Sequence, residues 1–347
     1  MTRITVRPAD LKADRELLIR TLSEYLTPLC GSRRFDWLYS DCPFGRTRAW
    51  LAVDEAKNSV IGAAAAFPRR FYLGGIESIG WVLGDFCLAS QYRSLGPALQ
   101  LQRACLGVLE QKDSEFCYDF PSASMVAVYK RLGFSETGVM LRLAKPLRVD
   151  RKVKQMITTL PAQRVIASVG NALLKFCSPE ADADQSLEIS AYQGHCGGEF
   201  TALEIEQRRG NCGIWFQRSA GYLNWRYVDN PLAHYEFVTA RRKGRLVGYA
   251  VWTQKEEDAS IVDLFGEDDP GMMRRLIAEV VGLVHNRGLM TVSVSVNESH
   301  PWISLFSEMG FRLRESSPVA VIPSKSFTEK IDSKLTGWYL MQGDRDS

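Results

Sequence analysis

The stretch Asp85-Phe-Cys-Leu-Ala-Ser-Gln-Tyr-Arg-Ser-Leu-Gly-Pro-Ala98 is the part of this chain that decides its fold. Residues 79–88 are an apolar run, which is typical of a buried strand. A short polar loop follows, and a helical pattern then extends to residue 111. The order predicts a strand, a tight turn and a long helix.

The turn between this strand and this helix has the features of an anion site. The N–H groups that open a helix lack backbone partners, and the helix dipole adds partial positive charge there. Gly96 has no side chain to keep a pyrophosphate away from these amides, and Pro97, near the first helical position, has no N–H to lose. Arg93 adds a positive charge at the mouth of the turn. A phosphate-bearing cofactor fits this pattern, although a turn without a ligand shares it.

The next segment repeats the alternation of strand and helix. Residues 115–120 predict a short strand, and residues 122–131 predict a helix of small and apolar residues. The helix ends in Tyr129-Lys-Arg-Leu-Gly133-Phe134, where Gly133 can take the left-handed conformation of a helix C-cap. Phe134 would begin the next strand, and a strand over residues 140–143 would close the first sheet. Before this core, residues 11–25 predict a helix, and residues 50–53 and 60–72 predict a hairpin that turns at 55–59.

These two motifs together resemble the acetyl-CoA-binding core of the GNAT acyltransferases. The resemblance consists of Arg93-x-x-Gly-x-Ala98 after a strand and Tyr129-x-x-x-Gly-Phe134 about thirty residues later. The opening Ile4-Thr-Val-Arg-Pro-Ala-Asp10 is similar to the start of many such domains. In that family the turn amides hold the pyrophosphate of coenzyme A, and the end of the strand pairs with the pantetheine arm and polarises the thioester. The tyrosine protonates the leaving thiolate.

The resemblance implies acetyl-CoA or another acyl-CoA as co-substrate, with Tyr129 as the catalytic acid. Ser122 stands where the family commonly has an asparagine that contacts the pantetheine. The other residues that the resemblance assigns to the cofactor belong to the strand end and the turn: Cys87, Leu88, Ala89, Arg93, Ser94, Leu95, Gly96, Pro97 and Ala98.

A direct transfer also needs an oxyanion site and a base for the acceptor amine. Backbone amides near Leu88 can stabilise the oxyanion. Asp85, just before the loop, is our candidate base, and Glu77 and Asp119 are weaker candidates. A proton relayed by water is also possible, and Asp85 can instead be an ordinary carboxylate at a strand end.

Length and composition agree with an enzyme of two domains. The chain has 347 residues, of which 46% are hydrophobic and 24% charged, as in ordinary globular proteins. A net charge of +3 without a concentrated Lys/Arg stripe argues against nucleic acid as a partner. The eight cysteines show no Cys-x-x-Cys spacing, so we predict no metal. The chain shows no signal peptide and no apolar run of bilayer length, so we expect a cytoplasmic protein. The oligomeric state stays open.

Residues 188–315 repeat the order of the first half, with Phe306-x-x-x-Gly-Phe311 in the place of the tyrosine motif. A repeat of about half the chain implies two domains. We therefore predict an α/β protein of two tandem GNAT-like domains, each a twisted mixed sheet flanked by helices. The predicted boundaries are 1–146 for the catalytic domain, 147–187 for a linker, 188–325 for a degenerate domain and 326–347 for a C-terminal extension. Within the linker we expect an amphipathic helix over 157–176, on a domain or a membrane surface, and a loose acidic stretch over 180–185.

The second copy lacks the residues for the chemistry. Gly266-Glu-Asp-Asp-Pro-Gly271 places three carboxylates where a phosphate needs amides and a cation, and Phe306 cannot donate a proton. We therefore expect one acyl-CoA per chain. The segment Tyr222-Leu-Asn-Trp-Arg-Tyr-Val-Asp-Asn-Pro231 resembles one in tandem-GNAT proteins encoded with polysaccharide genes. It is either a substrate element or a buried helix end.

The resulting hypothesis is an N-acyltransferase that acts on a small amine, with an amino sugar of a surface polysaccharide pathway as the first candidate. One alternative is a peptidoglycan-bridge aminoacyl transferase, which also pairs two such folds but takes aminoacyl-tRNA. The other alternative is a binding or regulatory module without turnover. Tyr129 and the glycine turn favour the enzyme.

Overall fold

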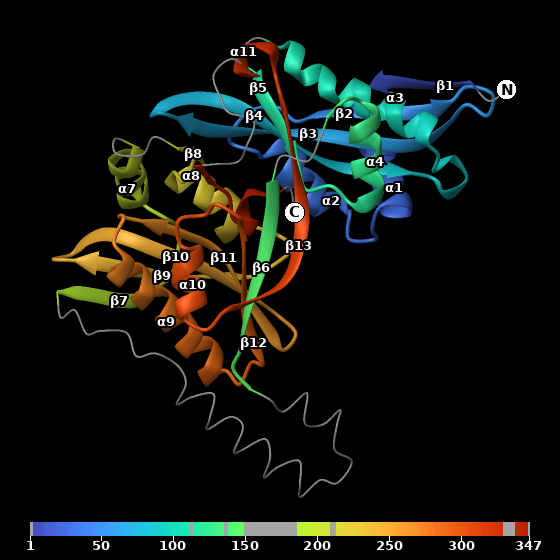
Figure 1. Ribbon diagram of the computed structural model, residues 1–347. Coiled ribbons are helices and arrows are strands. Elements are labelled where there is room, and N and C mark those ends of the chain that lie inside the picture. The colour runs from blue at the N-terminus through green and yellow to red at the C-terminus, as the bar shows by residue number, and fades with distance from the viewer. Residues whose placement is uncertain are drawn as a thin grey trace, which may run out of the picture.

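The computed structural model describes residues 3–111, 114–134, 138–148, 186–208, 213–328 and 337–345. Within these residues fourteen strands join one mixed sheet that runs through two lobes (Figure 1). The predicted helix over 157–176 and the stretch over 180–185 lie outside the described residues. No helix in the described ranges has both the length and the apolar character that crossing a membrane requires.

The first half follows the predicted order of elements. Its strands are β1 (Ile4–Pro8), β2 (Arg48–Asp54), β3 (Ser59–Leu73), β4 (Ile76–Leu88), β5 (Ser114–Asp119) and β6 (Gly138–Pro146). Its α-helices are α1 (Arg15–Tyr25), α2 (Ser32–Phe35), α3 (Leu95–Leu106) and α4 (Ala123–Arg131). Three short segments are a π-helix η1 (Asp36–Ser40) and the 3-10 turns η2 (Ser90–Tyr92) and η3 (Gly107–Glu110).

Two predictions for the first half can be compared with the structure. The hairpin predicted around residues 55–59 is confirmed as β2 and β3, with Asn58 left-handed in the turn (φ 47°). The first helix begins at Arg15 and not at Leu11, because Asp10 holds a separate turn. The Asp10 carboxylate accepts hydrogen bonds from the amides of Lys12 (2.8 Å) and Ala13 (3.0 Å).

The second half repeats this series. Its strands are β7 (Leu187–Tyr192), β8 (Ile214–Phe216), β9 (Tyr235–Arg242), β10 (Arg245–Lys255), β11 (Asp258–Gly266), β12 (Thr291–Asn297), β13 (Arg312–Pro323) and β14 (Trp338–Tyr339). Its helices are α7 (Gly198–Arg208), α8 (Ala220–Leu223), the π-helix η4 (Asn224–Val228), α9 (Pro270–Asn286), α10 (Ile303–Glu308), α11 (Lys325–Thr328) and the 3-10 turn η5 (Gln342–Asp344).

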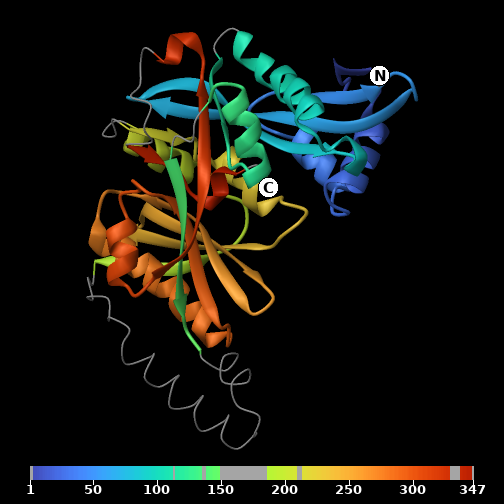
Figure 2. The ribbon, with the colours of Figure 1, turned by 45° about the vertical axis from the view of Figure 1, so that its right-hand side comes forward.

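The two halves exchange their last strands. The sheet order is β1-β2-β3-β4-β5-β13-β6-β12-β11-β10-β9-β7. We expected residues 140–143 to close the first sheet, but β6 pairs with β12 and with the first part of β13. The buried end of β13, residues 320–323, pairs with β5 instead. Figures 1 and 2 show β6 and β13 side by side between the lobes. The lobes therefore cannot separate without breaking strand pairs.

Helices cover both faces of the first-half sheet, and alternate strand residues point to opposite faces. On one face α3 and α4 pack with Leu83 of β4 and Cys117 of β5. On the other face α1 and α2 pack with Val82 of β4 and Tyr118 of β5. This second core continues into the other lobe, where it includes Trp225. The two lobes therefore share this second core, whereas the second lobe also has a core of its own around α9.

A short repeated motif lies where the lobes meet. Asp36-Trp-Leu-Tyr39 forms η1, and Asn224-Trp-Arg-Tyr227 lies in η4. The Trp37 Nε1 donates to the Trp225 carbonyl (2.7 Å), and the Trp225 Nε1 donates to the Trp37 carbonyl (2.9 Å). The two rings stack at 5.3 Å. The same contact is thus made in both directions, as in a local two-fold arrangement of the two motifs. Because Trp225 is used in this buried contact, residues 222–231 are better explained as a buried helix end than as a substrate element.

Candidate functional site

The first-half sheet splits open between β4 and β5. The two strands pair in parallel from Ile79 with Ser114 to Val82 with Tyr118. β4 then continues to Leu88, whereas β5 ends at Asp119. Strands that separate in this way leave backbone groups of β4 without a strand partner on that side. A cavity of about 160 Å³ lies in this split.

Residues from both faces of the sheet line the cavity. Gln102 and Cys105 of α3 and Met125 of α4 line it from one face, and Phe120 packs with the core of the other face. Arg345, from the far end of the chain, also lines it. The remaining lining residues are Ala64, Ala65, Leu83, Gly84, Phe86, Asp119, Pro121 and Ser122.

The predicted anion turn forms at the end of β4. Helix α3 begins at Leu95, with Ser94 as its N-cap, so Pro97 is the third helical residue and not near the first. The amide of Ala98 bonds to the Ser94 carbonyl (3.3 Å), whereas the amides of Leu95 and Gly96 open the helix. Gly96 is exposed, and a Cβ built on it meets no atom within 4 Å. The turn is therefore open to a ligand at the position where the sequence predicts a phosphate.

The residues at the end of β4 brace this turn. The Arg93 Nε donates to the Leu88 carbonyl (2.9 Å), and its Nη2 reaches the Tyr25 carbonyl (3.4 Å). The Ala89 amide donates to the Ile61 carbonyl (2.8 Å). These contacts hold the guanidinium against the carbonyls of Leu88 and Tyr25, and its role toward a phosphate stays a prediction.

Two other predicted cofactor residues lie beside the turn and the cavity. Cys87 is buried, and burial raises the pKa of its thiol to about 12, so it stays a neutral thiol. The Ser122 hydroxyl caps α4 by accepting from the Met125 amide (3.4 Å), and this residue lines the cavity. A cofactor role for both residues stays a prediction.

Tyr129 is separated from the cavity by Asp119 and Gln102, which line it. Its hydroxyl donates to Oδ2 of Asp119 (2.6 Å) and accepts from the Gln102 amide (3.2 Å). Burial and the Asp119 carboxylate raise the pKa of the Tyr129 hydroxyl well above its usual value of 10. The phenol therefore keeps its proton at neutral pH. Asp119 and Gln102 face the cavity and connect it to Tyr129.

Asp85 has a different environment from the one that a base requires. It lies at an irregularity in β4 with φ of 49°, and its side chain is buried. Its two oxygens accept from the Arg34 guanidinium (2.6 and 2.8 Å), and Oδ2 also accepts from the Tyr39 hydroxyl (2.7 Å). Burial opposes the charge on Arg34, but the Asp85 carboxylate raises the pKa of that guanidinium on balance. Asp85 does not line the cavity.

The same arrangement recurs in the second half. The Tyr227 hydroxyl donates to Asp263 (3.2 Å), and Asp263 forms an ion pair with Arg218 (2.9 Å). The recurrence in a half that lacks the glycine turn favours a structural role for Asp85. We therefore assign the base role to another residue below.

We expect Asp85→Asn to lower the free energy of unfolding by about 3–5 kcal/mol, because Arg34 is left as a buried charge without its counter-ion. Chemical denaturation measures this. Glu77→Gln is the matched control: its pair with Arg70 (2.9 Å) has both side chains at least 40% exposed, so a change below about 1 kcal/mol is expected. An Asp85→Asn protein of normal stability but without activity would restore Asp85 as the base.

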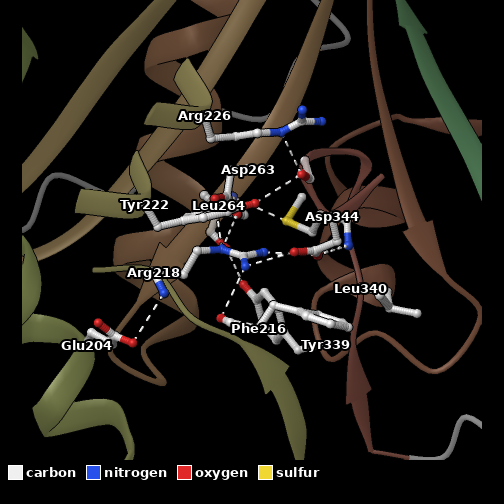
Figure 3. Close-up of polar contacts among 12 residues, drawn as sticks. Glu204, Phe216, Arg218, Tyr222, Arg226, Asp263, Leu264, Tyr339, Leu340 and Asp344 are labelled. Atoms are coloured by element: carbon white, nitrogen blue, oxygen red, sulfur yellow. Dashed lines mark hydrogen bonds and ion pairs between the residues drawn. The ribbon is translucent and has the colours of Figure 1, made fainter. Parts of the chain in front are cut away.

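The second-half split is filled by the chain itself. β11 and β12 pair in parallel only as far as Ile261 and Val294. Residues 338–344 enter the gap beyond: Met341 bridges to Val296, and the Asn297 amide donates to the Leu340 carbonyl (3.1 Å). We call residues 337–345 the tail. Figure 3 shows the tail residue Tyr339 below Leu264 of β11, and the Tyr339 hydroxyl donates to the Leu264 carbonyl.

The turn that leads into α9 is also closed. The Asp269 carboxylate caps α9 by accepting from the Met272 amide (3.1 Å). Arg242 bonds to both Glu267 (2.9 Å) and Asp269 (2.8 Å), so these carboxylates are paired. The amides that would hold a phosphate thus face a carboxylate of their own helix. This agrees with the expectation of one acyl-CoA per chain.

A clash at Gly343 provides a test of the tail's position. A Cβ on Gly343 would run into the Tyr227 hydroxyl and lie 3.1 Å from the Val262 carbonyl. We expect Gly343→Ala to cost about 1–3 kcal/mol of stability, as overpacking does, and to lower the melting temperature. Gly282→Ala, in α9 with nothing within 4 Å, is the control and should not destabilise. Equal stability of the two variants would mean that the tail lies elsewhere.

No protein-family model matches this chain, and no curated protein matches it. Solved structures do match. A probable N-acyltransferase from Enterococcus faecalis V583 has a TM-score of 0.67 at 13% identity, over 95% of this chain and 75% of that one. A GCN5-related N-acetyltransferase from Anabaena variabilis has a TM-score of 0.63 at 14% identity, over 92% and 72%.

A tandem GNAT protein from the clavulanic acid biosynthesis pathway is similar over 93% of this chain and 99% of its own, with a TM-score of 0.57 at 12% identity. The chain therefore has the GNAT fold. Its two halves are two such folds in tandem, as the sequence predicts.

Proposed function

We propose that this protein transfers an acetyl or related acyl group from acyl-CoA to a small amine, at the split between β4 and β5. The observation that carries the proposal is the contrast between the two halves. The first split is open, with the Gly96 turn at the end of β4 and the Asp119–Tyr129 pair beside the cavity. The second split is filled by the tail, and its turn is capped by Asp269.

The residues of the first half suit an acyl-CoA. The opening amides of α3 and the Arg93 guanidinium supply hydrogen bonds and positive charge for the pyrophosphate. The unpaired edge of β4 beyond Val82 suits the amide groups of the pantetheine arm, which can add to a strand edge. An acyl-CoA bound in this way directs its thioester to the cavity beside Asp119.

The chemistry requires one bond to form and one to break. The amine nitrogen attacks the thioester carbon, the carbon–sulfur bond breaks, and the thiolate leaves. An ammonium acceptor loses two protons, of which one ends on sulfur and the other in solvent. In this proposal Asp119, which faces the cavity, accepts a proton from the amine. Tyr129, which is hydrogen-bonded to Asp119 behind the cavity wall, supplies the proton that the thiolate takes up. The hydrogen bond between the two residues lets the proton that Asp119 gains pass to Tyr129, so both return to their starting protonation states.

The acceptor is a small amine, and an amino sugar of a surface polysaccharide pathway is the candidate that the sequence resemblance favours. We place the protein in the cytoplasm, where acyl-CoA is available. Within the described ranges, no group of three or more His, Cys, Asp or Glu side chains is arranged to hold a metal ion. The proposed transfer uses none.

An assay of thiol release from acetyl-CoA with a panel of amines tests this function. We expect release that depends on the amine in the wild-type protein. Binding of acetyl-CoA without turnover of any amine would favour a regulatory module. Turnover of aminoacyl-tRNA in place of acetyl-CoA would favour the peptidoglycan-bridge alternative.

A further inference from the structure

The tail leaves the second half and ends at the cavity of the first. Its last described residue, Arg345, lines that cavity, and the Arg345 guanidinium lies over the ring of Phe120 at 4.9 Å. The preceding residue, Asp344, accepts a hydrogen bond from the Tyr118 hydroxyl through its carbonyl (2.7 Å). Tyr118 and Phe120 pack with the core on the α1/α2 face. Arg345 therefore reaches the cavity on the face opposite to α3 and α4.

A buried polar network holds the tail in this position. Arg218 forms an ion pair with the Asp344 carboxylate (2.8 Å) and with Asp263 (2.9 Å), and all three side chains are buried. The Gly343 carbonyl accepts from the Arg226 Nε (2.9 Å) and from the Tyr222 hydroxyl (3.1 Å). Figure 3 shows Arg218, Tyr222 and Arg226 directed toward the tail. The position of Arg345 is thus set by residues of the second half.

The charge on Arg345 has no counter-ion in the part of the chain that the structure describes. The nearby Asp119 carboxylate is engaged by the Tyr129 hydroxyl and, through Oδ1, by the Phe120 amide (2.7 Å). A half-buried guanidinium at a cavity favours an anionic partner, and its planar fork suits a carboxylate or a phosphate.

We propose that Arg345 binds an anionic group of the acceptor, so that the protein acylates amines that also carry a carboxylate or a phosphate. This rests on the proposed function. The Gly96 turn and helices α3 and α4 place acyl-CoA on their side of the split, which leaves the face of Arg345 for the acceptor. The second half then has a defined role: its own split anchors the tail that selects the acceptor.

Matched pairs of amines that differ in one anionic group test this proposal. The pairs are glucosamine 6-phosphate with glucosamine, and lysine with cadaverine, each assayed with acetyl-CoA. We expect the charged member of at least one pair to have the higher kcat/KM, by about 10-fold or more. Arg345→Met should remove the difference through KM, and Arg345→Lys should keep part of it. Arg314→Met is the matched control, because Arg314 is exposed on β13 away from the cavity.

Three results would overturn the proposal. The first is a preference for the uncharged members, and the second is a charge preference that Arg345→Met leaves intact. The third is a preference for succinyl-CoA over acetyl-CoA that Arg345→Met removes with every amine, because the anion would then belong to the acyl group. If no amine is turned over, the proposal is tested by binding instead. Calorimetry then measures the binding of glucosamine 6-phosphate and of lysine to the protein saturated with coenzyme A. Binding of neither, or binding unchanged in Arg345→Met, contradicts the proposal.

A variant that displaces the tail tests the same proposal without changing Arg345 itself. Gly343→Ala should reduce the charge preference in parallel with Arg345→Met, whereas Gly282→Ala should leave it unchanged. Calorimetry with acetyl-CoA on the same preparations distinguishes a failure of the proposed function from a failure of the inference about Arg345. A protein that does not bind acetyl-CoA contradicts the proposed function. A protein that binds acetyl-CoA and shows no dependence on Arg345 contradicts this inference alone.

Discussion

Gly96→Glu should weaken acyl-CoA binding by about 2–4 kcal/mol, on the order of 10²-fold in Kd, while the protein stays folded. The loss follows from a carboxylate placed at the opening amides of α3, where it repels the pyrophosphate at close range. The apo protein has room for the side chain, because a Cβ on Gly96 meets no atom within 4 Å. A negative charge in the first turn of a helix is also favourable for the helix itself. Calorimetry measures the affinity, and thermal unfolding checks the fold.

Gly96→Ala is the matched control for this variant. It adds only a methyl group in open space, so we expect a much smaller loss of affinity than for the glutamate. Unchanged affinity in Gly96→Glu would remove the turn from the site. An equal loss in both variants would mean that shape and not charge governs binding at this turn.

Tyr129→Phe should lower kcat by about 10²-fold or more, with the affinity for acyl-CoA nearly unchanged. The variant keeps the buried ring and removes only the proton donor. Because the pKa of Tyr129 is raised well above 10 by burial and by Asp119, the wild-type phenol stays protonated through neutral and mildly alkaline pH. Wild-type kcat should therefore show no alkaline fall due to Tyr129 below about pH 10.

Asp119→Asn tests the base role of Asp119 separately from the acid role of Tyr129. We expect it to lower the rate most at low pH, where the acceptor is an ammonium that needs a base, and less at high pH, where the amine is already neutral. Full turnover by Tyr129→Phe would show that water or another group protonates the thiolate. A rate loss in Asp119→Asn that is independent of pH would remove Asp119 as the base.

Local patterns in the sequence were enough to predict much of the fold. The strand over 79–88, the turn at Gly96 and the helix over 122–131 each depend on nearby residues, and all three form. The internal repeat likewise predicted two halves of one fold. These features follow from residue periodicity and from turn chemistry, which act over short distances.

The strand exchange could not be predicted in this way. β6 and β13 could pair with a neighbour in either half, so their alternation does not identify the partner. The choice depends on contacts between residues far apart in the chain, such as β13 with β5. The role of Asp85 depended on Arg34, which lies 51 positions earlier and has no local signal for this pairing.

Two features of the site were missed for different reasons. Arg345 reaches the cavity only because the tail is anchored in the second half, and no local motif signals this. The Trp37 and Trp225 pair did leave a signal, in the match of Asp36-Trp-Leu-Tyr39 to Asn224-Trp-Arg-Tyr227. Aligning the two halves over these residues would have identified the two tryptophans as equivalent positions, although not their contact.

Calorimetric titration of the intact chain with acetyl-CoA tests the central claim most directly. The first half has the open split and the Gly96 turn, whereas in the second half the tail fills the split and Asp269 caps the helix. We predict saturation at one equivalent per chain, and loss of this binding in Gly96→Glu. Two equivalents per chain would contradict the account by adding an acyl-CoA site in the second half. One equivalent that Gly96→Glu leaves intact would also contradict it, because the Gly96 turn would then be no part of the site.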